Sequence, residues 1–308
     1  MGQGRQLVLA HHVAENQPML VAVRQFAAEV TRRTQGDLEI VLTQGGALSK
    51  LPEQLHHVLH GDVDMVIPPH DRFTSYSRKF ACISLPFVFD DYAHADRVLD
   101  GEFRDWIVPD LNDMGLIFLG NWEWGFRQLT NSRRTILKPE DLGGLKIRVP
   151  PILQYRAAIQ AMGGNAIPIE FDDLVRAIRQ GLVDGEENPV SVIHALKLYE
   201  SQTYLTVLNY AYCSSAHVIS KKSYASLTPI QQQILGEESR KAGLLARSLM
   251  RLHEEEQLAE LEQLGMRVDR PERAAFKAAA EPAYKVLRKA FGADVVNPFL
   301  EMVARARG

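Results

Sequence analysis

The chain lacks several features that mark membrane proteins and disulfide-stabilised or metal-binding proteins. Only two cysteines occur in 308 residues, Cys82 and Cys213, and neither stands in a metal-binding spacing. Two thiols this far apart are more often buried and free than paired, although one disulfide is compatible with the count. No apolar run approaches the roughly 18 to 20 residues that cross a bilayer, so the sequence predicts no membrane-spanning helix.

An excess of charge of one sign is also lacking. The formal net charge is −3, from 35 Lys and Arg against 38 Asp and Glu, without a long run of either sign. Nucleic acids and anionic membranes select strongly basic surfaces, so neither is expected as a partner. An anionic ligand would have to be held by individual cations, because the overall field does not attract it.

Sequence motifs of catalysis are missing as well. There is no Gly-x-Ser-x-Gly, no glycine-rich phosphate loop and no nucleophile beside a base. The pair Asp172 and Asp173 is better explained as the start of a helix, where the helix dipole favours acidic groups. His56 and His60 stand four residues apart on a predicted helix, a spacing that permits metal binding, but no third ligand is found nearby. We predict no enzymatic activity, no cofactor and no metal site.

Strand-like and helix-like segments alternate, which is typical of a largely parallel sheet flanked by helices. A second α/β unit covers roughly 125–212. The predicted strands are 6–10, 38–42, 63–67, 116–120, 126–130, 145–149 and 166–169, and the predicted helices are 18–34, 52–60, 94–99, 152–162 and 172–180.

The longest predicted helix starts at Thr228-Pro229, an N-cap with proline at the first helical position, and runs to about Leu264 before Gly265. At about 1.5 Å per residue this helix is longer than 50 Å, which exceeds the width of one lobe, so we expect it to span both lobes. A chain of 308 residues also exceeds what one core usually supports. We predict lobe I from 1–124 plus 213–252 and lobe II from 125–212 plus 253–308, joined by several crossings.

Two arginines beside strand ends are the main candidate ligand contacts. Arg148 lies near the end of a short predicted strand, which stops before Pro150 because proline has no N–H to donate. Arg127 lies in a second strand-like segment. A guanidinium keeps its proton and presents two parallel donors that match a carboxylate, and ligands of open α/β sheets bind at strand ends. Structural ion pairs are the alternative for both. Asn188 is either a further donor to the same carboxylate or an ordinary turn residue.

Aromatic side chains lie just before Arg127. Trp122 and Trp124 alternate on an extended stretch and are expected to face the same side. Core packing is the default for both. Because both stand just before Arg127, one of them could instead form an aromatic wall on which a ring of the ligand stacks.

Four ordered motifs together resemble the substrate-binding proteins of tripartite ATP-independent periplasmic (TRAP) transporters, the DctP-like family. The similarity covers nearly the whole chain. The motifs are Leu85-Pro86-Phe87-Val88-Phe89, Gly125-Phe126-Arg127-Gln128-Leu129-Thr130-Asn131, Asp141-Leu142-Gly143-Gly144-Leu145-Lys146-Ile147-Arg148-Val149-Pro150 and Val183-Asp184-Gly185-Glu186-Glu187-Asn188-Pro189.

The resemblance implies a two-lobe periplasmic-binding-protein fold of the α/β class, type II-like, with a ligand cleft between the lobes and a long helix spanning both. It implies that Arg148 is the main carboxylate clamp, with Arg127 and Asn188 assisting. The other positions implied as ligand contacts are Phe171, which packs on the ligand, and the variable specificity contacts His12, Leu51, Pro69, His70 and Tyr210.

Several variable positions depart from the sialic-acid-binding type. In this chain Leu51 and Pro69 occupy positions at which the sialic-acid-binding members have an acidic residue. Tyr210 stands where many members have a histidine, and Trp124 stands where they have a small polar residue. A sugar acid in such a pocket would leave hydroxyls unsatisfied, at about 1–3 kcal/mol each. We therefore expect an aromatic or other hydrophobic monocarboxylate, an α-keto or α-hydroxy acid whose second oxygen meets Arg127. A sugar acid or a dicarboxylate is the alternative.

The resemblance also implies a role in transport. The protein is expected to be periplasmic, with its leader removed from this sequence, to act as a monomer and to deliver its ligand to the membrane subunits of a TRAP transporter. A ligand-sensing module for a signalling receptor is a rival with the same pocket, and an enzyme acting on an organic acid is a weaker one.

Overall fold

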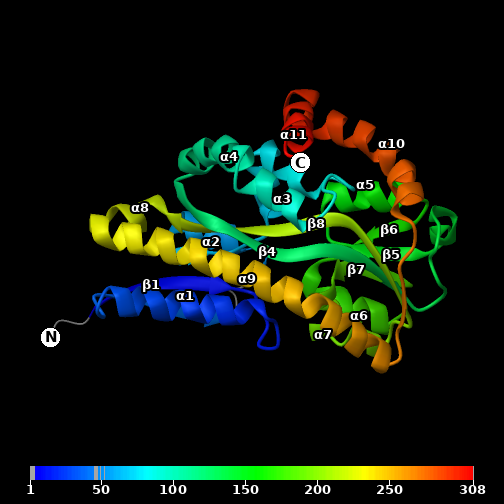
Figure 1. Cartoon of the computed structure of the whole chain (residues 1–308), viewed down its shortest axis with the longest axis horizontal. Helices are drawn as coiled ribbons and strands as arrows, with labels where there is room; N and C mark the ends of the chain where they lie inside the picture. The colour runs from blue at the N-terminus through cyan, green and yellow to red at the C-terminus, as the bar shows by residue number, and fades with distance from the viewer. Residues whose placement is uncertain (1–3, 45–47, 49, 52, 308) are drawn as a thin grey trace. The chain divides into compact units, whose positions relative to one another are not determined.

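The computed structural model describes residues 4–44, 48, 50–51 and 53–307, which form two compact units (Figure 1). Unit 1 consists of 1–80, 99–124 and 214–251, and unit 2 of 81–98, 125–213 and 252–308. Residues 81–98 therefore differ from the predicted division, which placed them in lobe I. Hydrogen bonds explain the difference, because Tyr155 Oη meets Ser84 Oγ at 3.1 Å and Gln154 Nε2 donates to Ala81 O at 3.0 Å.

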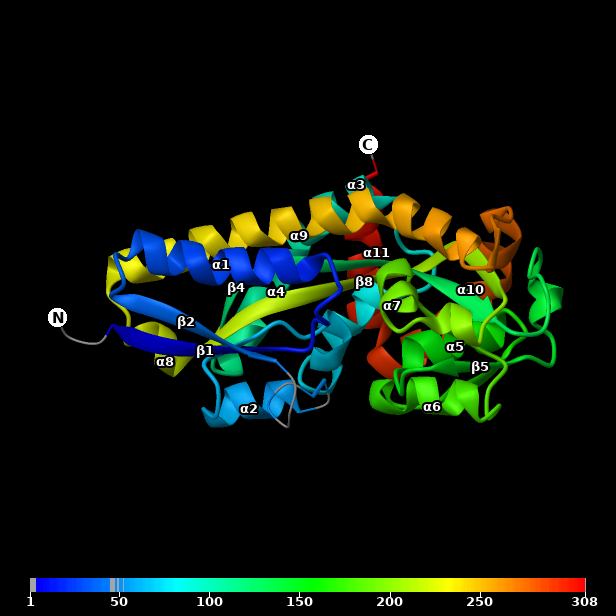
Figure 2. The same cartoon turned by 90° about the horizontal axis from the view of Figure 1, so that it is seen from below.

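Unit 1 is built on parallel strands. Its sheet has the order β2 (Leu38–Gln44), β1 (Arg5–His11), β3 (Met65–Val66) and β8 (Tyr204–Ser220), with β8 antiparallel to β3. In Figure 2, helices α1 (Met19–Arg33) and α2 (Gln54–His60) lie on opposite sides of β1 and β2. Strand β3 is shorter than the predicted 63–67, and it ends before Pro68 and Pro69, which have no N–H for the ladder.

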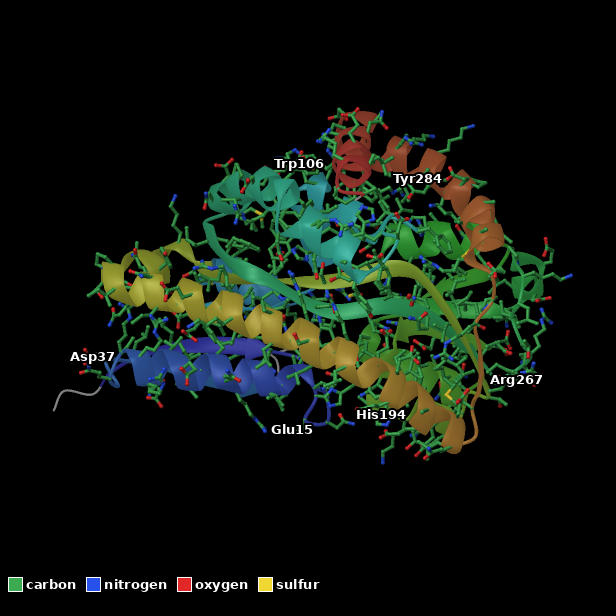
Figure 3. The ribbon with its side chains drawn as sticks, viewed as in Figure 1. Glu15, Asp37, Trp106, His194, Arg267 and Tyr284 are labelled. Atoms are coloured by element: carbon green, nitrogen blue, oxygen red, sulfur yellow. The ribbon has the colours of Figure 1, made fainter. Side chains whose placement is uncertain are left out.

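Helix α4 (Glu102–Asp113) of unit 1 was not predicted, and it carries Pro109 in its interior. Lys79 secures it: Nζ donates to the carbonyl of Trp106 at 2.9 Å and to Asp110 Oδ1 at 2.6 Å. The ammonium also lies 5.3 Å from the centre of the Trp106 ring, which Figure 3 labels. Unit 1 also contains the 3₁₀ helix His70–Ser75 and the short α8 (Lys221–Ala225), and a further 3₁₀ helix (Arg78–Ser84) continues from unit 1 into unit 2.

Unit 2 has the strand order β4 (Leu116–Asn131), β7 (Gly185–Pro189), β5 (Lys146–Val149) and β6 (Asn165–Pro168), and β9 (Arg267–Asp269) pairs with β8. Strands β5, β6 and β7 are parallel, whereas β4 is antiparallel to β7. The helices and 3₁₀ helices of unit 2 are α3 (Tyr92–Leu99), α5 (Leu153–Ala161), α6 (Leu174–Arg179), α7 (Val190–Ala195), α10 (Arg273–Phe291), α11 (Ala293–Arg305), and the 3₁₀ segments Pro139–Leu142, Phe171–Asp173 and Leu198–Glu200.

Two apolar clusters fill unit 2. One packs Leu129 and Ile147 of the strands against Tyr155 of α5 and Phe276 of α10. The other packs residues of α6, α7 and the end of α9 together, among them Leu174, Ile193 and Leu258. Both faces of this sheet are therefore covered, as expected for parallel strands. Tyr284 of α10, labelled in Figure 3, adds a hydrogen bond to the carbonyl of Pro86 at 2.7 Å.

The long predicted helix is confirmed as α9 (Pro229–Gln263), the yellow to orange helix of Figure 1. Its 35 residues correspond to about 52 Å at 1.5 Å per residue. The chain leaves it at Gly265, whose φ of +99° suits glycine. Helix α9 and strands β4 and β8 each contribute residues to both units. Within the described ranges, no helix combines the length and the apolar character needed to cross a membrane.

A predicted break between two strands was wrong. The expected strands 116–120 and 126–130 form the single strand β4, which continues through the tryptophans. Gly125 makes this continuity possible with a φ of +100°, a conformation that L side chains rarely adopt. A side chain here would also meet the Tyr92 hydroxyl at 3.1 Å. Both cysteines are buried and free, as predicted.

Candidate ligand-binding site

The two arginines lie at the edge of unit 2 where the parallel strands end. Arg148 is the penultimate residue of β5 and pairs in register with Glu186 of β7, while Arg127 of β4 pairs with Pro189, the last residue of β7. Residues in register share a face and successive residues alternate. Arg148 and Glu186 therefore leave the sheet on one face, and Arg127 and Glu187 on the other.

Arg148 is held in place inside unit 2. Its side chain is 1 % exposed, and Nε donates to the carbonyl of Ile169 at 2.8 Å. This bond to the backbone fixes the orientation of the guanidinium plane. The side chain is therefore buried and held in one orientation, as its predicted role in binding a carboxylate requires.

Arg127 has a different environment, because it forms a buried ion pair with Glu187. Its Nε and Nη2 face the two carboxylate oxygens, and Nη2 also donates to the carbonyl of Glu187 at 2.8 Å and to Asn188 Oδ1 at 3.2 Å. The guanidinium lies 4.6 Å from the centre of the Tyr155 ring. The ion pair and these hydrogen bonds engage Nε and Nη2 of Arg127. That Arg127 assists in holding a ligand remains a prediction, and Nη1 is the atom that would do so.

Glu186 was not among the residues predicted to contact a ligand, yet it lies beside both arginines. Its carboxyl group is fully buried, accepts from Asn188 Nδ2 at 2.5 Å and meets Thr130 Oγ1 at 3.1 Å. Burial and the neighbouring charge of Glu187 raise the pKa of Glu186 to about 7, against the opposing effect of Asn188, Arg148 and Arg127. The sequence signal was the pair of adjacent acids Glu186 and Glu187, and only the strand order places β7 between the two strands that carry the arginines.

Asn188 connects the two faces of the sheet. Its Oδ1 accepts from Arg127 and its Nδ2 donates to Glu186, so it is held from both sides at the end of β7. Tyr210, predicted as a specificity contact, is fully buried and donates its hydroxyl to Glu187 Oε2 at 2.6 Å. Phe171 is half-buried and packs against the cluster of α6 and α7. Their contacts with a ligand remain predictions.

Two of the predicted contacts in unit 1 form an aromatic pair. His12 stacks on Trp124 with 4.8 Å between ring centres and an interplanar angle of 28°. Trp124 Nε1 donates to Ser215 Oγ at 2.7 Å, and His12 Nδ1 lies 3.3 Å from Gln54 Nε2. Burial, with the charges of His11 and Arg72, lowers the pKa of His12 to about 3. The pair is therefore uncharged at neutral pH.

The remaining predicted contacts of unit 1 are buried. Pro69 forms a bridge with Ser215, and His70 Nδ1 lies 2.9 Å from Ser214 Oγ. The His70 ring is 1 % exposed between Phe80 and Phe103, and burial lowers its pKa to about 4. Leu51 is 9 % exposed. These residues shape the packing of unit 1, and a direct contact with a ligand remains a prediction for each.

Residues 9–290 match the family described as "Bacterial extracellular solute-binding protein, family 7", the DctP family. The chain belongs to this family. The two-lobe α/β fold and the resemblance inferred from the four motifs are thereby confirmed.

Three similar proteins illustrate the family. The 2,3-diketo-L-gulonate-binding periplasmic protein YiaO of Escherichia coli K12 is 29% identical over 262 residues, which is 85% of this chain and 80% of YiaO. The sugar acid binding protein DctPAm of Advenella mimigardefordensis, solved with galactonate, has a TM-score of 0.92 and 29% identity and covers 99% of both chains. A TRAP solute-binding protein of Ralstonia eutropha H16, solved with (S)-2-acetolactate, has a TM-score of 0.90 and 28% identity and covers 97% of this chain and 99% of its own.

The family determines the general role. Its members are extracytoplasmic binding proteins that work with membrane transporter subunits, and the similar proteins bind solutes rather than transform them. The buried cations of unit 2 fit such a role, since binding of an acid requires a fixed guanidinium and no reactive nucleophile.

Proposed function

We propose that this protein captures a small organic acid through Arg148 and delivers it to the membrane subunits of a TRAP transporter. The observation that carries the proposal is the position of Arg148, which is buried at the carboxyl edge of β5 with its Nε fixed on Ile169. A pre-oriented guanidinium in a partly dry environment pairs strongly with a carboxylate, because little ordering remains to be done on binding.

The charge of the surrounding cluster supports an anionic ligand. Arg127 and Arg148 contribute two positive charges, Glu187 contributes one negative charge, and Glu186 is neutral when protonated. With Glu186 protonated, the cluster carries one net positive charge, which one ligand carboxylate neutralises. A dicarboxylate would leave a second charge to be paired by other groups.

The favoured ligand is a monocarboxylate with an oxygen on carbon 2. Galactonate and (S)-2-acetolactate carry a 2-hydroxyl, and 2,3-diketo-L-gulonate carries a 2-oxo group. On a ligand held by Arg148, this second oxygen would be the acceptor for Nη1 of Arg127. A 2-hydroxy or 2-oxo acid therefore uses donors on both faces of the sheet edge.

The remainder of the ligand is proposed to be apolar, either branched or aromatic. The polar atoms of two predicted contacts are already engaged, Trp124 Nε1 by Ser215 and Tyr210 Oη by Glu187. These side chains would offer ring surface rather than hydrogen bonds to a ligand. A polyhydroxylated sugar acid is the second candidate, favoured by the galactonate complex of the Advenella protein.

Isothermal titration calorimetry on protein freed of bound metabolites by unfolding and refolding tests the proposal. We expect one-to-one binding of (S)-2-acetolactate or phenyllactate, with galactonate and succinate at least about 10-fold weaker, since unpaired polar groups cost about 1–3 kcal/mol each. Preference for galactonate would establish the second candidate. Failure of every acid to bind the refolded protein would overturn the acid-binding role.

Delivery is tested separately in vesicles that contain the membrane subunits of the cognate transporter. We expect uptake of the bound acid to require this protein and an ion gradient but no ATP. Uptake that proceeds equally without the protein would refute the delivery step while leaving binding intact.

A further inference from the structure

The C-terminal end of α2 gathers three histidines and an aspartate on the surface of unit 1. His56, His57 and His60 lie in the last turns of the helix, and Gly61 then adopts a φ of +84°. This left-handed turn brings the chain back, so that the Asp62 amide donates to the carbonyl of His57 at 2.9 Å. The Asp62 carboxylate therefore returns to the histidines instead of continuing away from them.

The side chains are close enough to hold one ion. Ligand atoms of His56, His57 and Asp62 all lie within 4.8 Å of one another. His60 stacks on His56 with 3.9 Å between ring centres, and His57 lies edge-on to His56 at 5.7 Å. Sequence spacing alone offered only the pair His56 and His60, and the turn at Gly61 supplies the missing carboxylate.

His60 is already oriented as a metal ligand usually is. Its Nδ1 lies 2.8 Å from the carbonyl of His56, which can only accept, so Nδ1 carries the proton and Nε2 of the neutral ring presents a lone pair. Metal-bound histidines commonly donate their other ring nitrogen to a carbonyl in this way. His57 Nδ1 instead lies 2.7 Å from Asp62 Oδ2, so these two proposed ligands already face each other.

We propose that this cluster is a binding site for a divalent transition metal ion of the zinc type, with His56, His57 and Asp62 as ligands and His60 available as a fourth. Imidazole ligands suit zinc, copper and nickel, whereas calcium and magnesium need several oxygen ligands and only one carboxylate is present here. The proposal does not depend on capture of an organic acid.

Binding requires a modest contraction of the cluster. Bonds of about 2.0–2.2 Å in a tetrahedral site place neighbouring ligand atoms roughly 3.3–3.5 Å apart, less than the present limit of 4.8 Å. His56 is exposed and the Asp62 side chain is 49% exposed, so both can move without disturbing the core. The hydrogen bond between His57 Nδ1 and Asp62 gives way to the metal, and the neutral His57 ring then carries its proton on Nε2.

Zinc titration of untagged, chelator-treated protein tests the site, with competition against a chromophoric chelator as the readout. We expect one equivalent of Zn²⁺ to bind, and no detectable binding of Mg²⁺. His56→Gln and Asp62→Asn should each weaken zinc binding by about 10-fold or more, in line with the effect of losing partners around a metal. The matched control is His253→Gln on α9, which replaces a histidine outside the cluster and should bind zinc as the wild type does.

The thermal midpoint without metal shows whether each variant is folded. If Asp62→Asn is destabilised by loss of its bond to His57, the exposed His56→Gln decides the matter. Zinc binding below one equivalent in the wild type, equal binding by wild type and His56→Gln, or equal loss in the His253→Gln control would each overturn the proposal. Nitrogen couplings in the paramagnetic resonance spectrum of bound Cu²⁺ should decrease in His56→Gln.

Discussion

The predicted ligand contacts of unit 2 include two arginines, whereas those of unit 1 are all uncharged at pH 7. In unit 2 two arginines and two glutamates share one buried edge. In unit 1 burial lowers the pKa of His12 to about 3 and that of His70 to about 4, so both rings are uncharged and packed on aromatic neighbours. The predicted contacts of unit 2 can therefore pair with charge, whereas those of unit 1 offer uncharged and largely apolar surface.

Arg148→Ala should have the largest effect on this division of roles. A buried carboxylate that loses its partner costs about 2–5 kcal/mol of binding, or roughly 30-fold to several thousand-fold in Kd. Arg148→Lys should recover only part of this loss, because an ammonium cannot form two parallel bonds. Calorimetry with the acid found to bind measures both variants.

Arg133→Ala is the control for Arg148, since Arg133 belongs to unit 2 and its side chain is 62% exposed beside Asp184. It should bind the acid as the wild type does. If Arg148→Ala also binds the acid as tightly as the wild type, unit 2 does not hold the carboxylate through this residue.

Glu186→Gln should change how stability depends on pH. The folded protein holds a proton on Glu186 up to a pKa of about 7, whereas the ordinary value is 4.5. The folded state therefore binds more protons between these values, and the free energy of unfolding should fall as pH rises through this window, by up to about 3 kcal/mol. Glu186→Gln has no such proton and should lack this part of the decrease in urea denaturation.

Glu255→Gln provides the comparison, because Glu255 is 75% exposed and should leave the pH dependence of the wild type intact. Binding should respond in the same direction as stability. An added ligand carboxylate favours the protonated form of Glu186, so acid binding should weaken above pH 7 in the wild type and remain flatter in Glu186→Gln. Parallel pH profiles of the two proteins would show that Glu186 is not linked to the charge of the site.

Trp124→Phe should have a smaller effect, confined to unit 1. It removes the hydrogen bond to Ser215 and part of the stack on His12, at about 1–2 kcal/mol of stability. Acid affinity should change by less than about 10-fold, with a larger change for aromatic acids than for galactonate. Trp106→Phe on α4 is the control and should leave acid binding unchanged. If Trp124→Phe lost as much acid affinity as Arg148→Ala, the expectation that the arginine in unit 2 contributes most to binding would be wrong.

His12→Gln should have the smallest effect on pH dependence. His12 is neutral well above its pKa of about 3, so it takes up no proton between pH 5 and 8. The pH profile of acid binding should therefore be parallel in the variant and the wild type, even if affinity differs. Loss of a proton-linked step in the variant would show that unit 1 also carries charge during binding.

Local patterns predicted the elements of this fold well where hydrophobic periodicity was strong. The long α9 followed from its proline start and glycine end, and the strands around Arg148 followed from the prolines that terminate them. Helix α4 was missed, and it depends on Lys79 from another segment as well as on its own sequence. The join of two predicted strands at Gly125 was missed because it depends on one positive φ.

The candidate site was predictable as a set of residues but not as an arrangement. Sequence position identified both arginines, yet their opposite faces follow from pairing register between strands far apart in the chain. The ion pair of Arg127 with Glu187 joins residues 60 positions apart. Which of several acids meets which arginine is a long-range property that the sequence alone does not show.

Each unit is assembled from three separate stretches of chain, and the last stretch of unit 1 begins only at residue 214. Strand β8 (Tyr204–Ser220) pairs with β3 through residues that belong to this last stretch. During synthesis neither core can close until more than two thirds of the polypeptide has emerged. No single proteolytic cut can release an intact half, so a stable fragment from limited digestion should never correspond to one unit alone.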